Sequence, residues 1–179
     1  RLIWRNKRTK TVFLMSFAFV LYGLIFFTSS TYDKMPGFLI FASLFITGGF
    51  VLNYGQFIPA WESSYYKMLM TQNLSYRKYL ESKWYLMVVV TAVLFILATP
   101  YIYFGLDKYL MIAAGALYNM GINTLVLLFA GAFNRKQIDL NASGFGNTQG
   151  TSAKQFIVVI PVMLVPVGLF YAFSLPFGF

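Results

Sequence analysis

The chain has 179 residues, of which 59% are hydrophobic and only 11% are charged, and it carries a formal net charge of +9. A soluble domain has about 25% charged residues, and this chain has too little polar surface to cover its long apolar segments. The composition therefore predicts an all-α polytopic membrane protein. The absence of Cys and His excludes disulfide frameworks, thiolate metal sites and histidine-based catalytic triads, and removes most zinc and haem chemistry.

Five segments of roughly twenty residues, the length that crosses a hydrocarbon core about 30 Å thick, contain no Asp, Glu, Lys or Arg. They are residues 11–29, 36–57, 84–104, 109–133 and 156–179. Residues 1–10 precede the first segment and place Leu2, Ile3 and Trp4 among cations. This predicts a basic amphipathic entry segment, which is either an interfacial helix or a simple stop signal. Two prolines inside the fifth segment are expected to kink it.

The basic residues divide the connecting segments into two kinds. Lys34 and Lys108 are the only cations in the two short outer loops, and each lies next to an acid. The other twelve lie in three inner segments and are Arg1, Arg5, Lys7, Arg8, Lys10, Lys67, Arg77, Lys78, Lys83, Arg135, Lys136 and Lys154. Because cations are enriched in cytoplasmic loops, this pattern places the amino end and the three inner segments in the cytoplasm. Cations beside helix ends also favour anionic lipid headgroups, and not nucleic acid, as their partner.

The inner segment 58–83 mixes Tyr, Met and Leu with charged residues, and its spacing predicts two short amphipathic helices at the membrane surface. Asn73 would separate them, and Ser75 is expected to cap the second helix, which runs into the third span. Glu62 has two interpretations that stay open. Its carboxylate either stabilises the N-terminus of the first helix or pairs with a basic residue on a cytoplasmic partner.

The inner segment 134–155 is polar and rich in Gly. Its Gly150 is followed by Thr151, where a nucleotide-binding loop requires Lys, and no strand is expected before it. We interpret it as a cytoplasmic loop without a nucleotide site. The chain is therefore expected to bind no cofactor directly and to have no enzymatic activity of its own.

Polar and small residues recur on one face of two spans. They are Gly49, Asn53 and Gln56 in the second span and Gly115, Asn119 and Asn123 in the fourth. Such a face either joins closely approaching helices by hydrogen bonds or lines a translocation route. In both cases we expect the amides to point into protein or water, because an unpaired amide in hydrocarbon is costly. No span contains an ionisable residue, which argues against an ion-coupled carrier and an intramembrane hydrolase.

Several strings of the chain carry a resemblance to a known family. They are Leu2-Ile-Trp-Arg-Asn-Lys-Arg8, Gly48-Gly-Phe-Val-Leu-Asn-Tyr-Gly-Gln56, Trp61-Glu-Ser-Ser-Tyr65, Phe133-Asn-Arg-Lys136 and Asn147-Thr-Gln-Gly-Thr-Ser152. With these strings the chain resembles, over nearly its whole length, bacterial ABC-2-type transporter permeases of unknown substrate. The match implies the carboxy-terminal half of a longer permease. An ABC-2 permease domain usually has six spans, whereas five are counted here.

The resemblance implies an exporter permease in the bacterial inner (cytoplasmic) membrane, with ATP bound by a separate cytoplasmic ABC ATPase subunit. Segment 58–83 would be the coupling loop that docks on that ATPase, although a helix that merely lies on lipid stays an alternative. A second permease copy would be needed to line a route, so a dimer is implied. The rival function is a non-transporting structural or assembly membrane protein that binds a partner.

Two sets of residues are the candidates for these roles. Docking needs exposed aromatic anchors with a polar rim, and the candidates for it are Glu62, Tyr65, Tyr66, Arg77 and Lys78. The candidates for lining a translocation route are Asn53, Gln56, Asn119 and Asn123.

The topology can be tested by cysteine labelling, because the chain has no Cys of its own. A cysteine at Ser30 or Gly105 should react with a membrane-impermeant reagent added outside the cell, and a cysteine at Ser82 should react only after the membrane is opened. Labelling at Ser82 alone from outside would reverse the predicted orientation.

Overall fold

The computed structural model describes residues 7–62, 68, 71, 75–132 and 153–177 of the chain. In this part of the chain every regular element is a helix, and there is no strand. Five helical segments are long and apolar enough to cross a membrane, which confirms the predicted all-α class and its number of spans. These are α2 (Lys7–Thr28), α4 (Pro36–Gly55), α7 (Tyr76–Leu97), the continuous segment Leu106–Ala132, and α10 (Ala153–Phe177).

Short elements join these spans. Helix α3 (Ser30–Asp33) connects α2 to α4, α5 (Ile58–Trp61) follows α4, and the 3-10 helix η1 (Thr99–Phe104) connects α7 to α8. The fourth span consists of α8 (Leu106–Tyr118), one π-helical turn η2 (Asn119–Asn123) and α9 (Thr124–Ala132). Most of the predicted first amphipathic helix, with Asn73, and the loop up to residue 152 lie outside the described residues.

The third span begins and ends earlier than the apolar run predicts. Helix α7 starts at Tyr76, so the predicted second amphipathic helix and the span are one continuous helix. Ser75 occupies the N-cap position with extended φ and ψ, but its hydroxyl makes no capping hydrogen bond. The helix stops at Leu97 because Pro100 lacks the N–H that would continue it.

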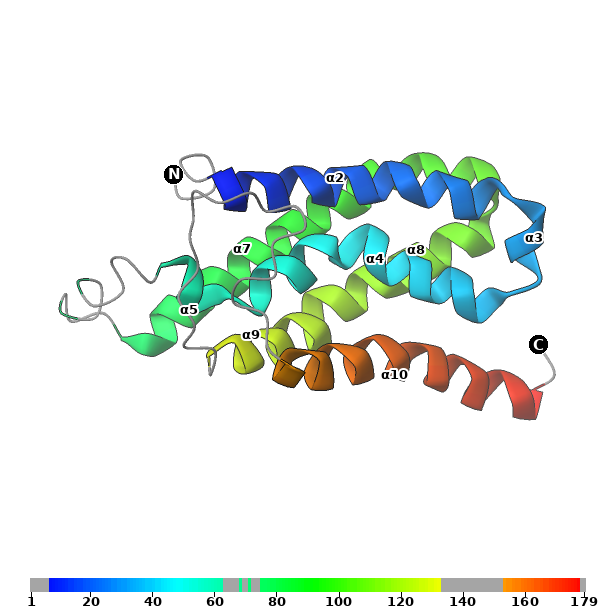
Figure 1. Cartoon of the computed structure of the whole chain (residues 1–179). Coiled ribbons are helices and arrows are strands. Elements are labelled where there is room, and N and C mark those ends of the chain that lie inside the picture. The colour runs from blue at the N-terminus through cyan, green and yellow to red at the C-terminus, as the bar shows by residue number, and fades with distance from the viewer. Residues whose placement is uncertain (1–6, 63–67, 69–70, 72–74, 133–152, 178–179) are drawn as a thin grey trace.

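Helix α4 is the centre of the bundle. In an 18-residue apolar stretch of α4, 72% of the residues are buried, against 11% in the corresponding stretch of α10. Helix α4 also contacts α2, α7, α8, α9 and α10 (Figure 1). The other spans therefore surround α4 and expose their outer faces, as lipid-facing helices do.

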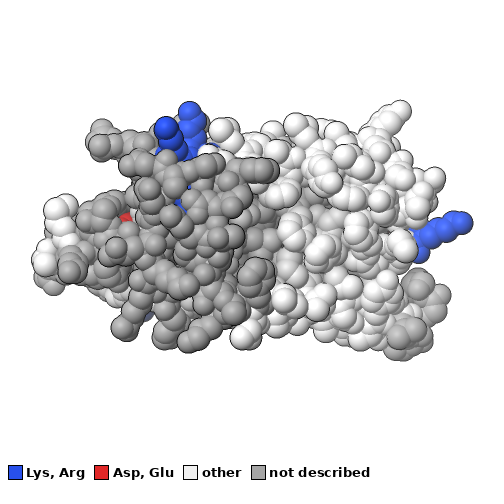
Figure 2. Space-filling view, viewed as in Figure 1, with Lys and Arg blue, Asp and Glu red and all other residues white. Residues whose placement is uncertain are grey.

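The ends of the spans form two groups, which we call the basic end and the short-loop end. The basic end holds the start of α2, α5, the start of α7 and the end of α9, and the short-loop end holds α3 and η1 (Figure 1). On the face in Figure 2, coloured charged residues lie only at the two ends of the bundle. The described parts of the segments predicted to share a side of the membrane thus lie together, while the assignment of the basic end to the cytoplasm stays a prediction.

Small residues let α4 and the fourth span approach closely. A Cβ added at Gly48 would lie 2.5 Å from Asn119 Oδ1, and one at Gly115 would lie 2.8 Å from Ser43 Oγ. At Gly131 an added Cβ would collide with the backbone carbonyl of Gly55. Gly49 faces a different neighbour, because a Cβ added there would meet Phe19 of α2 at 2.7 Å.

Helix α10 is joined to the fourth span by a hydrogen bond that a proline makes available. Pro166 has no N–H, so the carbonyl of Val162, one turn earlier, loses its usual helical donor. The Tyr118 hydroxyl donates to this carbonyl at 2.9 Å. The proline thus creates an acceptor inside the apolar region, and a side chain from a neighbouring helix satisfies it.

The close approach at Gly131 leads to a stability prediction with an internal control. The G131A substitution should destabilise the protein by about 1–3 kcal/mol, the usual cost of overpacking, because the colliding atoms are backbone and cannot move aside. The control is G168A on α10, where an added Cβ meets nothing within 4 Å and should be neutral or slightly stabilising. Thermal unfolding in one detergent would compare them, and equal melting temperatures would contradict the proposed contact.

Candidate functional site

A sealed polar centre joins α4 to the fourth span. The Asn119 side-chain amide donates to the Leu44 carbonyl at 3.0 Å and to Thr47 Oγ1 at 2.8 Å. Asn123 in turn donates to Asn119 Oδ1. Both asparagines and Thr47 are fully buried, so this cluster matches the helix-contact interpretation of the polar face.

The π-helical turn η2 belongs to the same cluster. A π turn interrupts the regular backbone ladder, and the Thr124 hydroxyl donates to the Asn119 carbonyl at its start. The carbonyl oxygen of the Asn123 side chain and the Thr91 hydroxyl of α7 are buried and have no hydrogen-bond partner among the described residues. The polar centre therefore contains two groups that could form further hydrogen bonds inside the bundle.

The predicted route-lining residues do not form one group. Asn53 is exposed and donates to the Gly49 carbonyl of its own helix at 2.8 Å, so it is not sealed inside the bundle, and its expected position against protein or water stays a prediction. Gln56 is half-buried at the C-cap position, directly after the end of α4. Asn119 and Asn123 point into the protein, as predicted. Sequence reasoning missed Thr47 and Thr91, because a lone hydroxyl in an apolar helix commonly bonds its own backbone.

A second cluster lies at the basic end, and we call it the basic-end clamp; it consists of Arg8, Trp61, Glu62, Tyr79 and Lys83. The Lys83 ammonium pairs with the Glu62 carboxylate, and their side chains are only 14% and 6% exposed. The same ammonium lies 5.3 Å from the centre of the Tyr79 ring. The Arg8 guanidinium lies 5.8 Å from the centre of the Trp61 ring, within the range of cation–π attraction.

The clamp holds the short helix α5 against the end of α4. The Trp61 indole N–H donates to the Tyr54 carbonyl at 3.0 Å, and the two rings stack with centroids 5.8 Å apart. Trp61 and Tyr54 are both about 1% exposed. Because Glu62 follows directly, its pairing with Lys83 extends the contact from α4 to α7.

The clamp corrects the placement of Glu62. The sequence left two contacts open for this carboxylate, the N-terminus of a helix or a basic residue on a partner, and Glu62 was a docking candidate on the second. In the structure it is buried and faces Lys83 of the same chain. Of the other predicted docking residues, Tyr65 and Tyr66 lie outside the described residues. Arg77 and Lys78 are exposed on the first turn of α7, and Arg77 pairs with Glu81 at 2.8 Å.

A groove of about 480 Å³ lies beside Arg77 at the basic end. Tyr76, Leu80 and Trp84 of α7 form one wall, and Leu125 and Phe129 of α9 form the other. Apolar walls with a charged rim are typical of surfaces that receive a partner side chain. The groove therefore adjoins Arg77 of the predicted docking region.

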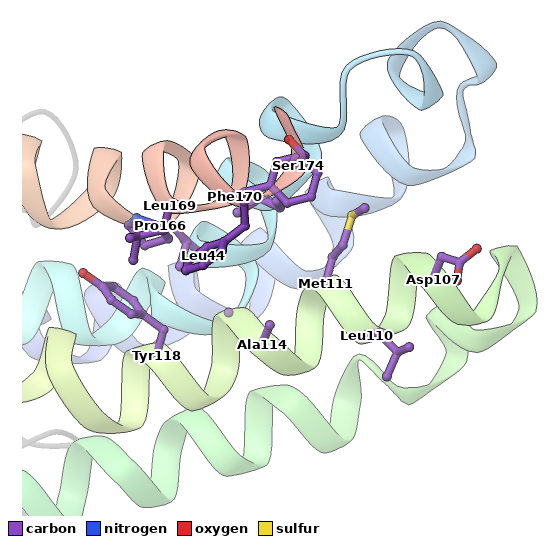
Figure 3. A pocket seen from close by; sticks show the side chains of 13 residues that line it. Leu44, Asp107, Leu110, Met111, Ala114, Tyr118, Pro166, Leu169, Phe170 and Ser174 are labelled. Atoms are coloured by element: carbon purple, nitrogen blue, oxygen red, sulfur yellow. The ribbon is translucent and has the colours of Figure 1, made fainter. Parts of the chain in front are cut away.

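A larger cavity, which we call the α8–α10 pocket, has a volume of about 760 Å³. Its walls come from α8 and α10 (Figure 3), and Ile40 and Leu44 of α4 also line it. Asp107 and Ser174 are its polar residues towards the short-loop end, and Tyr118 lies at the other end of the α8 row (Figure 3). The sequence did not predict this pocket, because most of the residues that line it are apolar and have the pattern of any lipid-facing helix.

The fold and these sites define the class as an all-helical membrane protein. A family model described as "Family of unknown function (DUF5687)" matches residues 1–179. The chain therefore belongs to the DUF5687 family. No curated protein and no solved structure matches it. Among the described residues, no group of three Cys, His, Asp or Glu side chains could hold a metal ion.

Helix α7 takes part in one buried ion pair, Lys83–Glu62, and one exposed pair, Arg77–Glu81. Comparing the two tests how much the clamp stabilises the protein. The K83M substitution keeps the side-chain stem and leaves the Glu62 charge buried without a counterion, so it should cost about 3 kcal/mol. The R77M substitution breaks a pair whose side chains are 87% and 57% exposed and should cost under about 1 kcal/mol.

Thermal unfolding followed by tryptophan fluorescence would measure both effects. Adding E62Q to K83M removes the uncompensated charge and should recover part of the lost stability. Equal losses for K83M and R77M would mean that the Glu62–Lys83 pair does not stabilise the basic end.

Proposed function

We propose that this chain is a membrane-spanning permease subunit of an ABC-type exporter, driven by a separate cytoplasmic ATPase. The support is of two kinds: the strings that resemble ABC-2-type permeases, and five apolar spans whose cations gather at one end. In this proposal the basic end faces the cytoplasm of a bacterial cell, ATP binds to the partner subunit, and a second permease copy completes the route.

The observation that carries the proposal is the attachment of segment 58–83 to the central helix. Trp61 is bonded to Tyr54 of α4, and Glu62 is paired with Lys83 of α7. A force applied to this segment would therefore act on two spans at once. Because α4 contacts every other span, its movement would reach the whole bundle. A coupling loop requires this mechanical link.

The docking surface for the ATPase comprises Arg77, Lys78 and the groove beside them, together with Tyr65 and Tyr66 of the same segment. Arg77 and Lys78 are exposed cations at the start of α7, and Trp84 and Phe129 supply aromatic surface nearby. Glu62 takes a different role in this scheme, since its carboxylate anchors the segment through Lys83 and does not meet the partner.

The alternative is a structural or assembly protein of the membrane that binds a partner and moves nothing. One observation favours it: Asn119 and Asn123, predicted to line a route, are fully buried and bonded within the bundle. In the transport proposal these residues hold the closed conformation, and their contacts must change during a cycle. Co-purification with an ATPase separates the two functions.

Charge reversal at the start of α7 tests the docking surface. The R77E/K78E double variant should lose the co-purifying ATPase while inserting into the membrane normally, because acids at a helix N-terminus are favourable. The matched control is K7E/K10E, which makes the same charge change at the start of α2. Subunit stoichiometry and ATP turnover of the purified complex are the measurements. Unchanged stoichiometry and turnover in R77E/K78E would refute the docking role.

A further inference from the structure

We propose that the α8–α10 pocket binds one acyl chain of a membrane lipid that carries a primary ammonium headgroup, and that Asp107 holds the ammonium. The pocket volume of about 760 Å³ lies within the usual range of ligand sites, about 300–1,000 Å³. This inference concerns binding alone, so it is independent of whether the protein transports anything.

The length of the pocket suits one leaflet of a bilayer. Asp107 and Tyr118 lie at opposite ends of the α8 row in Figure 3. A helix rises about 1.5 Å per residue, so these residues are about 16 Å apart along the helix axis. The hydrocarbon core is about 30 Å thick, so the pocket covers about half of it, which is the depth of a single acyl chain.

The inner part of the pocket offers no unmet polar group to a ligand. The Tyr118 hydroxyl already donates to the Val162 carbonyl that Pro166 leaves without its helical donor. Ala114 and Gly115 provide space on α8, and Leu169 and Phe170 form the facing wall on α10. Leu110 and Phe173 are 55% and 66% exposed, so the pocket opens sideways toward lipid and a chain can enter from the bilayer.

The two polar residues of the pocket towards the short-loop end, Asp107 and Ser174, are both suited to accept hydrogen bonds from an ammonium group. The Ser174 hydroxyl donates to the Tyr171 carbonyl at 3.3 Å, so its oxygen is left as an acceptor. The neighbouring cation, Lys108, does not neutralise Asp107. Its ammonium pairs with Asp33 at 2.6 Å and donates to the Phe27 carbonyl at 2.9 Å. The Asp107 carboxylate is exposed and forms no ion pair among the described residues.

The negative charge of Asp107 therefore favours a lipid headgroup that carries an ammonium. A carboxylate at the end of an apolar pocket attracts an ammonium and repels a phosphate that has no cation beside it. An acid in the first turn of a helix is favourable, which explains why Asp107 stands at the start of α8. It does not explain why Asp107 also lines the pocket. A second copy of the chain is the competing occupant, but a helix packing here would cover Asp107 without supplying a defined cation.

The test uses the purified chain in nanodiscs of equal parts phosphatidylethanolamine and phosphatidylglycerol, followed by stepwise delipidation and native mass spectrometry. Wild-type protein should retain phosphatidylethanolamine in preference to phosphatidylglycerol. The D107N substitution should reduce that preference about fivefold, the upper limit for an ion pair in contact with water. D107E, which keeps the charge, should preserve it.

A second pair of variants tests the pocket itself. A114W fills the cavity and should abolish lipid retention, whereas the control L117W changes a residue on α8 that is 72% exposed and does not line the pocket. A photoactivatable acyl chain on phosphatidylethanolamine should cross-link to residues 107–118 and 162–174. The proposal is overturned if A114W retains lipid like wild type, if D107N keeps the full preference, or if the photoactivatable lipid labels neither of these two ranges.

Discussion

The hydrogen bonds of the Asn119 side chain determine how the central helices meet. In hydrocarbon a polar group must find its partner inside the protein, and this amide finds Leu44 and Thr47 on α4. The contact requires Gly48, because any larger residue there would occupy the space of the amide. Since α4 contacts all the other spans, the arrangement of the spans around α4 depends on this contact between Asn119 and α4.

Ion pairs at the two ends join segments that are distant in the sequence, but the two pairs differ in their surroundings. Glu62 and Lys83 are almost fully buried, whereas Asp33 is 47% exposed beside Lys108. A buried pair constrains geometry strongly, because separating the partners would leave a charge without compensation. The basic end is therefore the more rigid attachment, which suits a segment that receives a partner.

Helix α10 has the opposite character. Only 11% of its 18-residue apolar stretch is buried inside the bundle. Two of its contacts with the bundle are the hydrogen bond from Tyr118 to the Val162 carbonyl and the packing of Tyr171 on Gly37. Where α10 diverges from α8, protein packing is incomplete and the pocket forms. A lipid chain would supply the missing contacts there, so binding and the stability of α10 would be linked.

The sequence by itself determined the class, the number of spans, the grouping of the charged segments and the start of α7 after Ser75. These follow from local properties: the run length of apolar residues, the side on which cations lie and the preferences of capping residues. Burial of Asn119 and Asn123 could also be predicted, because unpaired amides are expensive in hydrocarbon.

Only the tertiary structure decided which partners those residues meet. Asn53 and Asn119 look alike in the sequence, yet one is exposed and the other buried, because the rotation of each helix against its neighbours sets which face is covered. Glu62 similarly appears to be a surface acid until α7 brings Lys83 against it. Tyr118 and Pro166 lie in different spans, and nothing in either local sequence indicates that the freed Val162 carbonyl will face that hydroxyl. Contacts between distant segments depend on helix packing angles, and local sequence does not encode these.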